Sequence, residues 1–191
     1  VEGTKNIVDT ILSVNPMCKL IYASSISVLN IDKNNSKKPT KYAISKFKAE
    51  QIVWDYMKHK SLISTIIYAG LIYGPHDLRL VQSIIKYLKA GRLFYIQGGE
   101  TLAPLIYVDD ICDLFIMASE KDCANDKSYI SVKGLKIGIH DFINMLADRV
   151  GCPRPKYMLP KKHLMAMAIF LEEIFDIFKI KTKPPLTRRT V

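Results

Sequence analysis

Cysteine is scarce in this chain of 191 residues, which contains only four. No two of them form a Cys-x-x-Cys pair, and each lies in or beside an apolar run, as buried free thiols do. This usage excludes a disulfide-rich secreted domain and favours a reducing compartment. No cluster of His and Cys has metal-ligand spacing either, so we predict no metal site.

The sequence also lacks an apolar run long enough to cross a membrane, which takes about 20 residues. Its longest apolar stretch, residues 163–178, is interrupted by acidic side chains and flanked by basic ones. It fits a helix lying on a membrane surface, the roof of an apolar substrate pocket, or simple packing on its own lobe. We expect at most a peripheral membrane contact through residues 161–181. We expect the protein in the cytoplasm or on the cytosolic face of a membrane such as the endoplasmic reticulum.

Acidic residues are outnumbered, with 18 Asp and Glu against 28 Lys and Arg, for a net charge of +10. Such an excess favours an anionic partner: nucleic acid, lipid headgroups or a dinucleotide phosphate. The basic side chains gather in residues 33–48 and 179–189 instead of forming one stripe. Solvated surface lysines explain most of them, and we predict no nucleic-acid partner.

What the sequence does contain is a repeated alternation of apolar strands and helices. Residues 20–25 form a predicted strand that ends in two serines, and a second strand is predicted at residues 62–67. The helix between them, capped by Thr40, completes a βαβ unit of a parallel sheet. Ligands of such sheets bind outside the carboxyl ends of the strands. Ser25 lies at that edge, and so do Tyr42 and Lys46 at the start of the helix.

The remaining pattern predicts an α/β fold: the second half of a doubly wound parallel sheet with a small, mostly helical substrate lobe. Amphipathic helices are predicted at residues 4–14, 77–88, 111–118 and 141–150, and strands at residues 93–96, 105–108 and 129–133. We assign residues 1–75 and 105–150 to a partial dinucleotide-binding domain, and residues 76–104 and 151–191 to the substrate lobe.

Spacing alone does not single out one tyrosine, because four Tyr-x-x-x-Lys pairs occur: Tyr42/Lys46, Tyr56/Lys60, Tyr129/Lys133 and Tyr157/Lys161. The second lies at the far end of its helix, the third lies in a predicted strand, and the fourth contains Pro160. Only the first opens a helix beside a strand end that carries a hydroxyl group.

That pair predicts acid–base chemistry. A free tyrosine has a pKa of about 10, and an ammonium within about 4 to 6 Å can lower it by roughly 1 to 3 units. Tyr42 would then act as a general acid or base, with Ser25 bonding the same substrate oxygen. Such a group moves a proton on or off an alcohol or carbonyl oxygen while a hydride moves at carbon. The alternative is a surface Tyr and Lys on an amphipathic helix.

Several motifs carry a family resemblance: Val1-Glu2-Gly3-Thr4, Tyr22-Ala23-Ser24-Ser25-Ile26-Ser27-Val28, the Tyr42/Lys46 helix, Ile72-Tyr73-Gly74-Pro75 and Tyr107-Val108-Asp109-Asp110. With them the sequence resembles an extended short-chain dehydrogenase/reductase, of the NAD(P)-dependent epimerase, dehydratase and hydroxysteroid dehydrogenase group. Residues 151–155, the apolar helix after them and residues 183–188 are similar to the 3β-hydroxysteroid and sterol dehydrogenase branch.

The family's glycine fingerprint, Gly-x-Gly-x-x-Gly after a first strand, occurs nowhere in these residues. Gly98 and Gly99 lead into a strand and are interpreted as a turn, because a phosphate-binding loop needs a helix after it. The resemblance places the fingerprint before residue 1, so we expect a fragment or an incomplete gene model that lacks roughly 80 to 100 residues.

The resemblance implies NAD or NADP as cofactor, with Lys46 lowering the pKa of Tyr42 and holding the nicotinamide ribose. It also places the cofactor beside the ends of the two strands, at Ala23 and Ser24 and at the backbone of Ala69, Gly70 and Leu71. The family often has Arg-Pro where this chain has Tyr68-Ala69.

The leading hypothesis is oxidation or reduction of a secondary alcohol or ketone, on a sterol-like or otherwise apolar small molecule. Apolar walls built from Met165, Phe170 and Ile174 favour it. A nucleotide-sugar epimerase or dehydratase with the same three residues is the alternative, which a polar, arginine-bearing pocket would favour. A non-catalytic dinucleotide-binding module is a further alternative, and a homodimer is left open.

Overall fold

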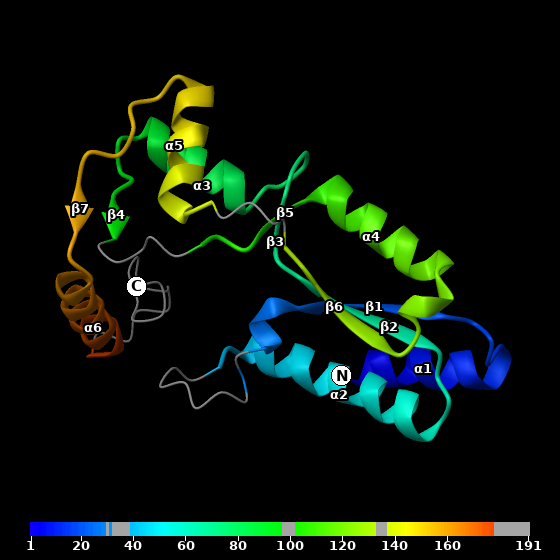
Figure 1. Ribbon diagram of the computed structural model, residues 1–191. Helices are drawn as coiled ribbons and strands as arrows, with labels where there is room; N and C mark the ends of the chain where they lie inside the picture. Colours follow the sequence, from blue (N-terminus) through cyan, green and yellow to red (C-terminus); the bar gives the residue numbers. More distant parts are fainter. Residues whose placement is uncertain (30, 32–38, 97–101, 133–136, 178–191) are drawn as a thin grey trace. The chain divides into compact units, whose positions relative to one another are not determined.

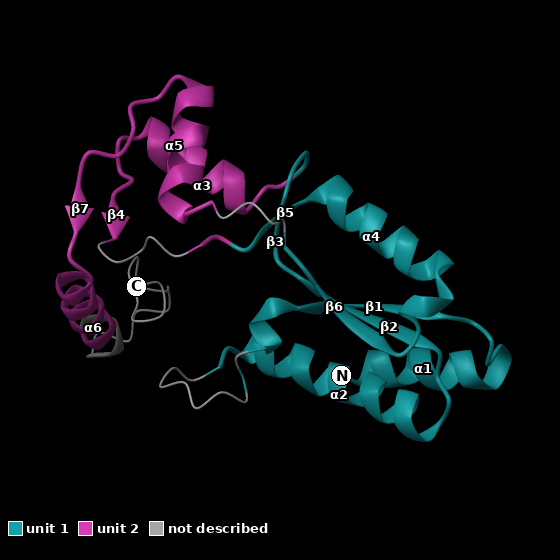
Figure 2. Cartoon of the chain, viewed as in Figure 1, with its two compact units in different colours: residues 1–76, 104–134 teal, residues 77–103, 135–191 magenta. Residues whose placement is uncertain are grey.

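The computed structural model describes residues 1–29, 31, 39–96, 102–132 and 137–177, with the side chains of residues 174–177 excepted (Figure 1). The chain divides into two compact units (Figure 2): unit 1 comprises residues 1–76 and 104–134, and unit 2 comprises residues 77–103 and 135–191. The interpretation of these units as cofactor and substrate domains stays a prediction.

Unit 1 is built from strands and helices in alternation. Its elements are α1 (Glu2–Val14), β1 (Leu20–Ser25), η1 (Ile26–Val28), α2 (Lys41–His59), β2 (Ser64–Ala69), β3 (Leu71–Tyr73), β5 (Leu105–Tyr107), α4 (Val108–Glu120), η2 (Asp122–Ala124) and β6 (Lys127–Ser131). The strand order β1-β2-β6 is parallel throughout. The predicted βαβ unit and α/β class are therefore confirmed.

The central strand β2 separates two apolar layers, because its successive side chains point to opposite faces. Ile66 packs with Val8 and Val53 from α1 and α2, whereas Ile67 packs with Ala118 of α4. Figure 1 shows α1 and α2 below this sheet and α4 above it. Each fully buried aliphatic side chain contributes about 1.5 to 3 kcal/mol, so the two layers together hold the strand ends in register.

The start of α2 is fixed locally. The Thr40 side chain accepts a hydrogen bond from the Ala43 amide at 2.8 Å, as the sequence predicted for this cap. The face of the helix that packs on the sheet carries the buried residues Ala43, Ala49, Glu50, Val53 and Tyr56. Glu50 is the one charged side chain among them.

At the end of β2 the chain passes into a second small parallel pair, β3 with β5, through Gly70. The Gly70 amide donates to the Ser131 carbonyl and the Leu71 amide donates to the Pro104 carbonyl. A Cβ atom at position 70 would lie 2.4 Å from the Pro104 oxygen. Only glycine fits where these three backbone segments converge.

Unit 2 consists of α3 (Leu80–Lys89), β4 (Tyr95–Ile96), α5 (Ile139–Val150), β7 (Met158–Leu159) and α6 (Lys161–Ile177). Leu88 on α3 packs with Ile143 and Ala147 on α5. This contact places α5 in unit 2, whereas the sequence interpretation grouped residues 139–150 with the first domain. Gly91 and Gly151 end α3 and α5 with φ angles of 62° and 68°, which favour glycine.

Asp77 lies three residues before α3 and accepts hydrogen bonds from the amides of Arg79, Leu80 and Val81, whereas the sequence pattern predicted a helix from residue 77. Because these bonds favour the ionised carboxyl group, the pKa of Asp77 lies below its ordinary value. The predicted turn at Gly98-Gly99 and the motif at residues 183–188 lie outside the described residues.

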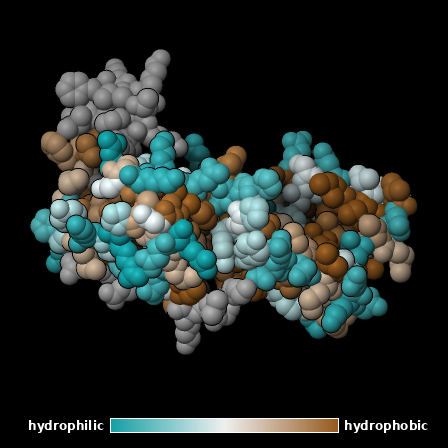
Figure 3. Space-filling view, turned by 90° about the horizontal axis from the view of Figure 1, so that it is seen from above, coloured by the Kyte–Doolittle hydropathy of each residue, from teal (hydrophilic) through white to brown (hydrophobic). Residues whose placement is uncertain are grey.

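Apolar side chains remain at the surface of both units (Figure 3). On α6, Leu164 and Ala168 are buried, whereas Phe170 is 63% exposed. Of the other predicted wall residues, Met165 is half-buried and Ile174 lies outside the described side chains. No helix in the described part of the chain is long and apolar enough to cross a membrane.

Candidate active site

The carboxyl ends of β1 and β2 lie side by side in unit 1. Ser25 and Ala69 are register partners in the parallel pair, and Ala69 in turn pairs with Ser131 of β6. The helix α2 packs across β1, so side chains on its first turns reach this sheet edge. The predicted residues from both strands therefore share one edge of the sheet.

Lys46 extends from α2 to the end of β1. Its Nζ donates a hydrogen bond to the Ala23 carbonyl oxygen at 2.6 Å and lies 5.3 Å from the centre of the Tyr22 ring. Burial lowers the pKa of Lys46, and the negative charge of Glu50 opposes that effect in part. The amine is thus held at a defined position by the strand backbone.

Tyr42 lies on the first turn of α2 with its side chain 59% exposed. Within the described part of the chain, its hydroxyl group makes no hydrogen bond, which leaves this group available to a ligand. Tyr22 lies close enough to interact with it: burial first, then the charges of Glu50 and Tyr42, raise the pKa of Tyr22. Tyr22 therefore lies near both Tyr42 and the Lys46 amine at the strand edge.

Ser25 is engaged locally. Its Oγ accepts hydrogen bonds from the Ser27 amide at 3.3 Å and from the Ser27 hydroxyl at 3.0 Å, and it caps η1. Among the described contacts, none joins Ser25 to Tyr42 directly. Since a hydroxyl oxygen that accepts can still donate its own proton, Ser25 keeps one donor for a substrate oxygen.

The two residues before Ser25 differ in orientation. Ala23 is exposed and offers its carbonyl group to Lys46. Ser24 is 3% exposed, and its hydroxyl donates to Glu50 at 2.5 Å. Any contact between Ser24 and a cofactor would therefore involve its backbone and not its side chain.

At the end of β2, two of the three backbone amides of the predicted cofactor segment, those of Gly70 and Leu71, are already used. The Gly70 amide donates to Ser131 at 3.2 Å and the Leu71 amide donates to Pro104 at 2.7 Å. The Leu71 side chain is 42% exposed. From Gly70 and Leu71, a cofactor would therefore meet carbonyl oxygens and apolar surface.

Sequence reasoning missed two residues of this site, Tyr22 and Glu50. Tyr22 supplies the ring beside the Lys46 amine, and Glu50 supplies the nearest buried charge. One signal was present in the sequence: Glu50 follows Lys46 by four positions, which puts both on one side of a helix.

The side chains at this edge fit the ribose end of a nicotinamide dinucleotide. An ammonium group has three N–H donors, of which Lys46 uses one on Ala23, and Tyr42, four residues earlier on α2, is exposed. Ribose hydroxyl groups accept and donate hydrogen bonds, so they match both partners. The 191 residues hold no Gly-x-Gly-x-x-Gly segment for the pyrophosphate.

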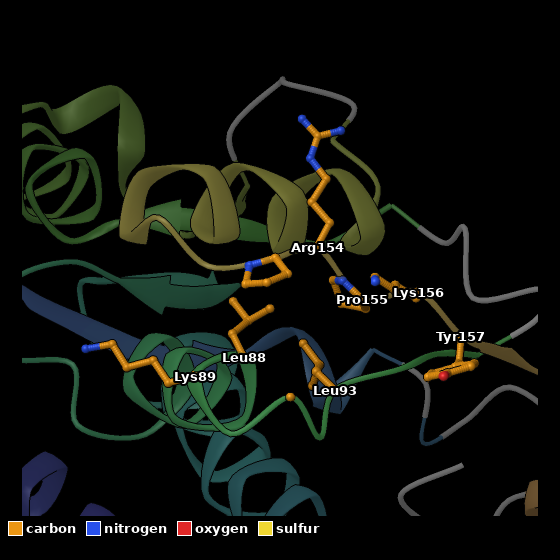
Figure 4. Close-up of a pocket in the computed structure, with 9 residues that line it drawn as sticks. Leu88, Lys89, Leu93, Arg154, Pro155, Lys156 and Tyr157 are labelled. Carbon is orange, nitrogen blue, oxygen red and sulfur yellow. The ribbon is translucent and has the colours of Figure 1, made fainter.

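A separate cavity of about 250 Å³ lies within unit 2 (Figure 4). It lies between the end of α3 and the segment that leads to β7, and its lining includes Leu88, Lys89, Leu93, Pro155, Lys156 and Tyr157. Arg154 also lines it, but both Nε and Nη2 of its guanidinium group donate to Asp148. The cavity thus combines apolar walls with two lysines.

Comparisons with known proteins agree with this geometry. The model of the NAD dependent epimerase/dehydratase family matches residues 1–130. The chain is 26% identical, over 197 positions, to 3beta-hydroxysteroid-dehydrogenase/decarboxylase isoform 2 of Arabidopsis thaliana, in an alignment that covers 93% of this chain and 35% of that protein. It is 28% identical, over 174 positions, to the bovine (Bos taurus) sterol-4-alpha-carboxylate 3-dehydrogenase, decarboxylating, with 83% and 49% covered.

Among solved structures, UDP-glucuronic acid 4-epimerase from Bacillus cereus in complex with NAD has a TM-score of 0.69 at 20% identity. The match covers 82% of this chain and 54% of that one, and it shows the shared fold. The chain thus spans between about a third and a half of these relatives.

The matched family is NAD dependent, which confirms the predicted class of cofactor at the level of the family. The resemblance to the sterol dehydrogenase branch is confirmed by the relatives from Arabidopsis and cattle. With residues 1–130 matched and the parallel sheet in place, the chain belongs to the NAD dependent epimerase/dehydratase family.

Proposed function

We propose that the protein containing this chain oxidises a secondary alcohol or reduces a ketone with NAD or NADP, on a sterol-like or otherwise apolar substrate. The observation that supports this most is the 2.6 Å contact of the Lys46 amine with the Ala23 carbonyl oxygen, which holds Lys46 at the strand end, one helical turn after the exposed Tyr42.

In this proposal Tyr42 is the general acid and base. During oxidation its phenolate accepts the hydroxyl proton of the substrate, and during reduction its phenol returns a proton to the carbonyl oxygen. A bound nicotinamide cofactor would supply or accept the hydride. Lys46 stabilises the phenolate by its charge and donates hydrogen bonds to the ribose, while Ser25 donates to the substrate oxygen and orients it.

An apolar substrate is favoured by the relatives and by unit 2. Two relatives are named for 3β-hydroxysteroid and sterol substrates, and α6 exposes apolar side chains such as Met167 and Phe170. A flexible methionine suits a pliable apolar wall.

A nucleotide-sugar substrate is the second candidate, and the cavity in unit 2 favours it. Lys89 and Lys156 could bind phosphate groups there, although the guanidinium group of Arg154 is engaged by Asp148. A non-catalytic dinucleotide-binding module would have the same fold without turnover.

The test uses the protein at its natural length with NAD or NADP. Absorbance at 340 nm is followed with a 3β-hydroxysteroid, and UDP-sugars are analysed for epimerisation in parallel. Reduction of the cofactor with the steroid alone supports the leading proposal. Conversion of UDP-sugars alone favours the second candidate, and cofactor binding with neither reaction favours the module.

A peripheral membrane contact through residues 161–181, a cytosolic location and a homodimer stay predictions. Lys161 and Lys162 lie at the start of α6, beside its exposed apolar side chains, which fits binding to anionic lipid. Co-sedimentation with phosphatidylserine vesicles, compared with phosphatidylcholine vesicles, tests the first. Sedimentation velocity measures the oligomeric state.

A further inference from the structure

Glu50 is a carboxylate in the interior of unit 1, with 3% of the residue exposed. Acidic side chains are almost never fully buried unless they are paired with a cation. Among the ion pairs of the described residues, none includes Glu50. A buried charge without a contacting cation is costly, so its presence calls for an explanation.

Three neutral groups from three places in the fold bind this carboxylate. Ser24 of β1 donates to Oε2 at 2.5 Å, Tyr68 of β2 donates to Oε1 at 2.8 Å, and Trp54 of α2 donates to Oε1 through Nε1 at 3.3 Å. The network therefore links the helix to the two strands whose ends form the candidate active site. Its donors satisfy the oxygens but leave the negative charge uncancelled.

The charge acts on Lys46, one helical turn earlier. Residues four apart on a helix are neighbours, with about 6 Å between them along the axis. Burial lowers the pKa of Lys46, and Glu50 raises it. Ser24, which Glu50 binds, is also next to Ala23, whose carbonyl group accepts the Lys46 hydrogen bond. Glu50 thus influences both the charge of Lys46 and the position of its acceptor.

We propose that Glu50 is a positioning residue of the active site, which fixes the end of β1 against α2 and places a negative charge one helical turn from Lys46. The proposal rests on the proposed function of Lys46 for its catalytic meaning. The other titratable groups near this network are Tyr22 on β1, Tyr42 on α2 and Tyr68 on β2. All three are tyrosines and none is a carboxylate, so no neighbour replaces the negative charge of Glu50 when it is removed.

The test compares Glu50→Gln, which removes the charge and keeps the shape, with Asp55→Asn. Asp55 is an exposed carboxylate on the same helix, nine positions from Lys46 or about 13 Å along the axis. Lysines are labelled by ¹³C-methylation in the protein at its natural length, and the Lys46 signal is assigned by its loss in Lys46→Arg. We expect a lower pKa of Lys46 in Glu50→Gln and no change in Asp55→Asn.

Turnover supplies the second readout. We expect kcat at the alkaline end of the pH profile to fall about tenfold in Glu50→Gln with little change in KM, and Glu50→Asp to recover part of it. If Glu50 had a purely structural role, Glu50→Gln would lower the thermal stability of the protein without shifting the alkaline limb of the pH profile of kcat. Trp54, the only tryptophan of the 191 residues, reports the network independently, and its emission should change in Glu50→Gln.

A folded Glu50→Gln variant with an unchanged pKa of Lys46 overturns the proposal. If Glu50→Gln does not fold, the pKa of Lys46 is measured in Glu50→Asp, whose shorter side chain moves the carboxylate farther from Lys46. A lower pKa of Lys46 in Glu50→Asp supports the proposal, and an unchanged pKa rejects it. If the protein turns over no alcohol, the proposed function fails, yet the pKa comparison still reports on the link between Glu50 and Lys46.

Discussion

The amine of Lys46 on α2 lies 2.6 Å from the carbonyl oxygen of Ala23 on β1. The contact joins a helix to the strand that it follows in the chain, two residues before the strand ends. A lysine in bulk water keeps its charge at little cost, whereas this one is half-buried and its pKa is lowered. This desolvation of the Lys46 ammonium group occurs at a position where the proposed chemistry needs an amine held in place.

Gly70→Ala is expected to destabilise unit 1 by about 1 to 3 kcal/mol. The new Cβ would lie 2.4 Å from the Pro104 oxygen and 3.0 Å from the Ser131 oxygen, both of which belong to the backbone and cannot move independently. Urea denaturation measures the change. Gly3→Ala is the matched control, because position 3 is helical and has no atom within 4 Å of the added carbon. It should stabilise by about 0.5 to 1 kcal/mol. Equal effects at the two positions would contradict the account.

Asp77→Ala is expected to weaken the start of α3 by about 1 kcal/mol, because three amides lose their acceptor. The pKa of Asp77 lies below its ordinary value of 3.8, so its stabilisation is fully present above that value and is lost as the pH falls through the lowered pKa. The difference between the two proteins should be full at pH 7 and shrink below about pH 4. Hydrogen exchange at the amides of Arg79, Leu80 and Val81 measures it, and exchange rates that are the same in both proteins at pH 7 would refute the prediction.

Tyr68→Phe is expected to lower the free energy of unfolding by about 1 to 3 kcal/mol at neutral pH, because Glu50 loses a donor. Burial and Glu50 raise the pKa of Tyr68 to about 12. The stabilisation from its phenol is fully present below the ordinary pKa of 10.0 and is lost as the pH rises through about 12, so the difference between the two proteins should narrow across that window. Denaturation at several pH values tests this, with the exposed Tyr87→Phe as a control that should have no effect.

The sequence was enough to predict the parallel unit around α2. An apolar strand, a Thr cap and a second apolar strand follow each other at short range, and such signals depend on local geometry. The structure bears them out in the pairing of β1 with β2 and in the hydrogen bond of Thr40.

The network around Glu50 could not be predicted in the same way. A helix pattern assigns a glutamate to the solvent face, and Ser24 looks like any residue at a strand end. Glu50 is buried because Ser24 of β1 and Tyr68 of β2, which lie 26 and 18 positions away in the chain, donate hydrogen bonds to it. Long-range partners of that kind leave no periodic trace in a sequence.

The grouping of α5 was also beyond the sequence pattern. Its amphipathic spacing fits a helix that packs on a sheet and a helix that packs on another helix equally well. Only the contact of Ile143 and Ala147 with Leu88 decides that it belongs with α3.

The most direct test of the central claim is the turnover number of Tyr42→Phe in the protein at its natural length. Tyr129→Phe is the matched control, since Tyr129 also precedes a lysine by four positions but lies on β6. The account predicts that kcat for a secondary alcohol falls by about 10² to 10⁴ in Tyr42→Phe, with cofactor affinity within a few-fold, and stays unchanged in Tyr129→Phe. Full activity in Tyr42→Phe would contradict it.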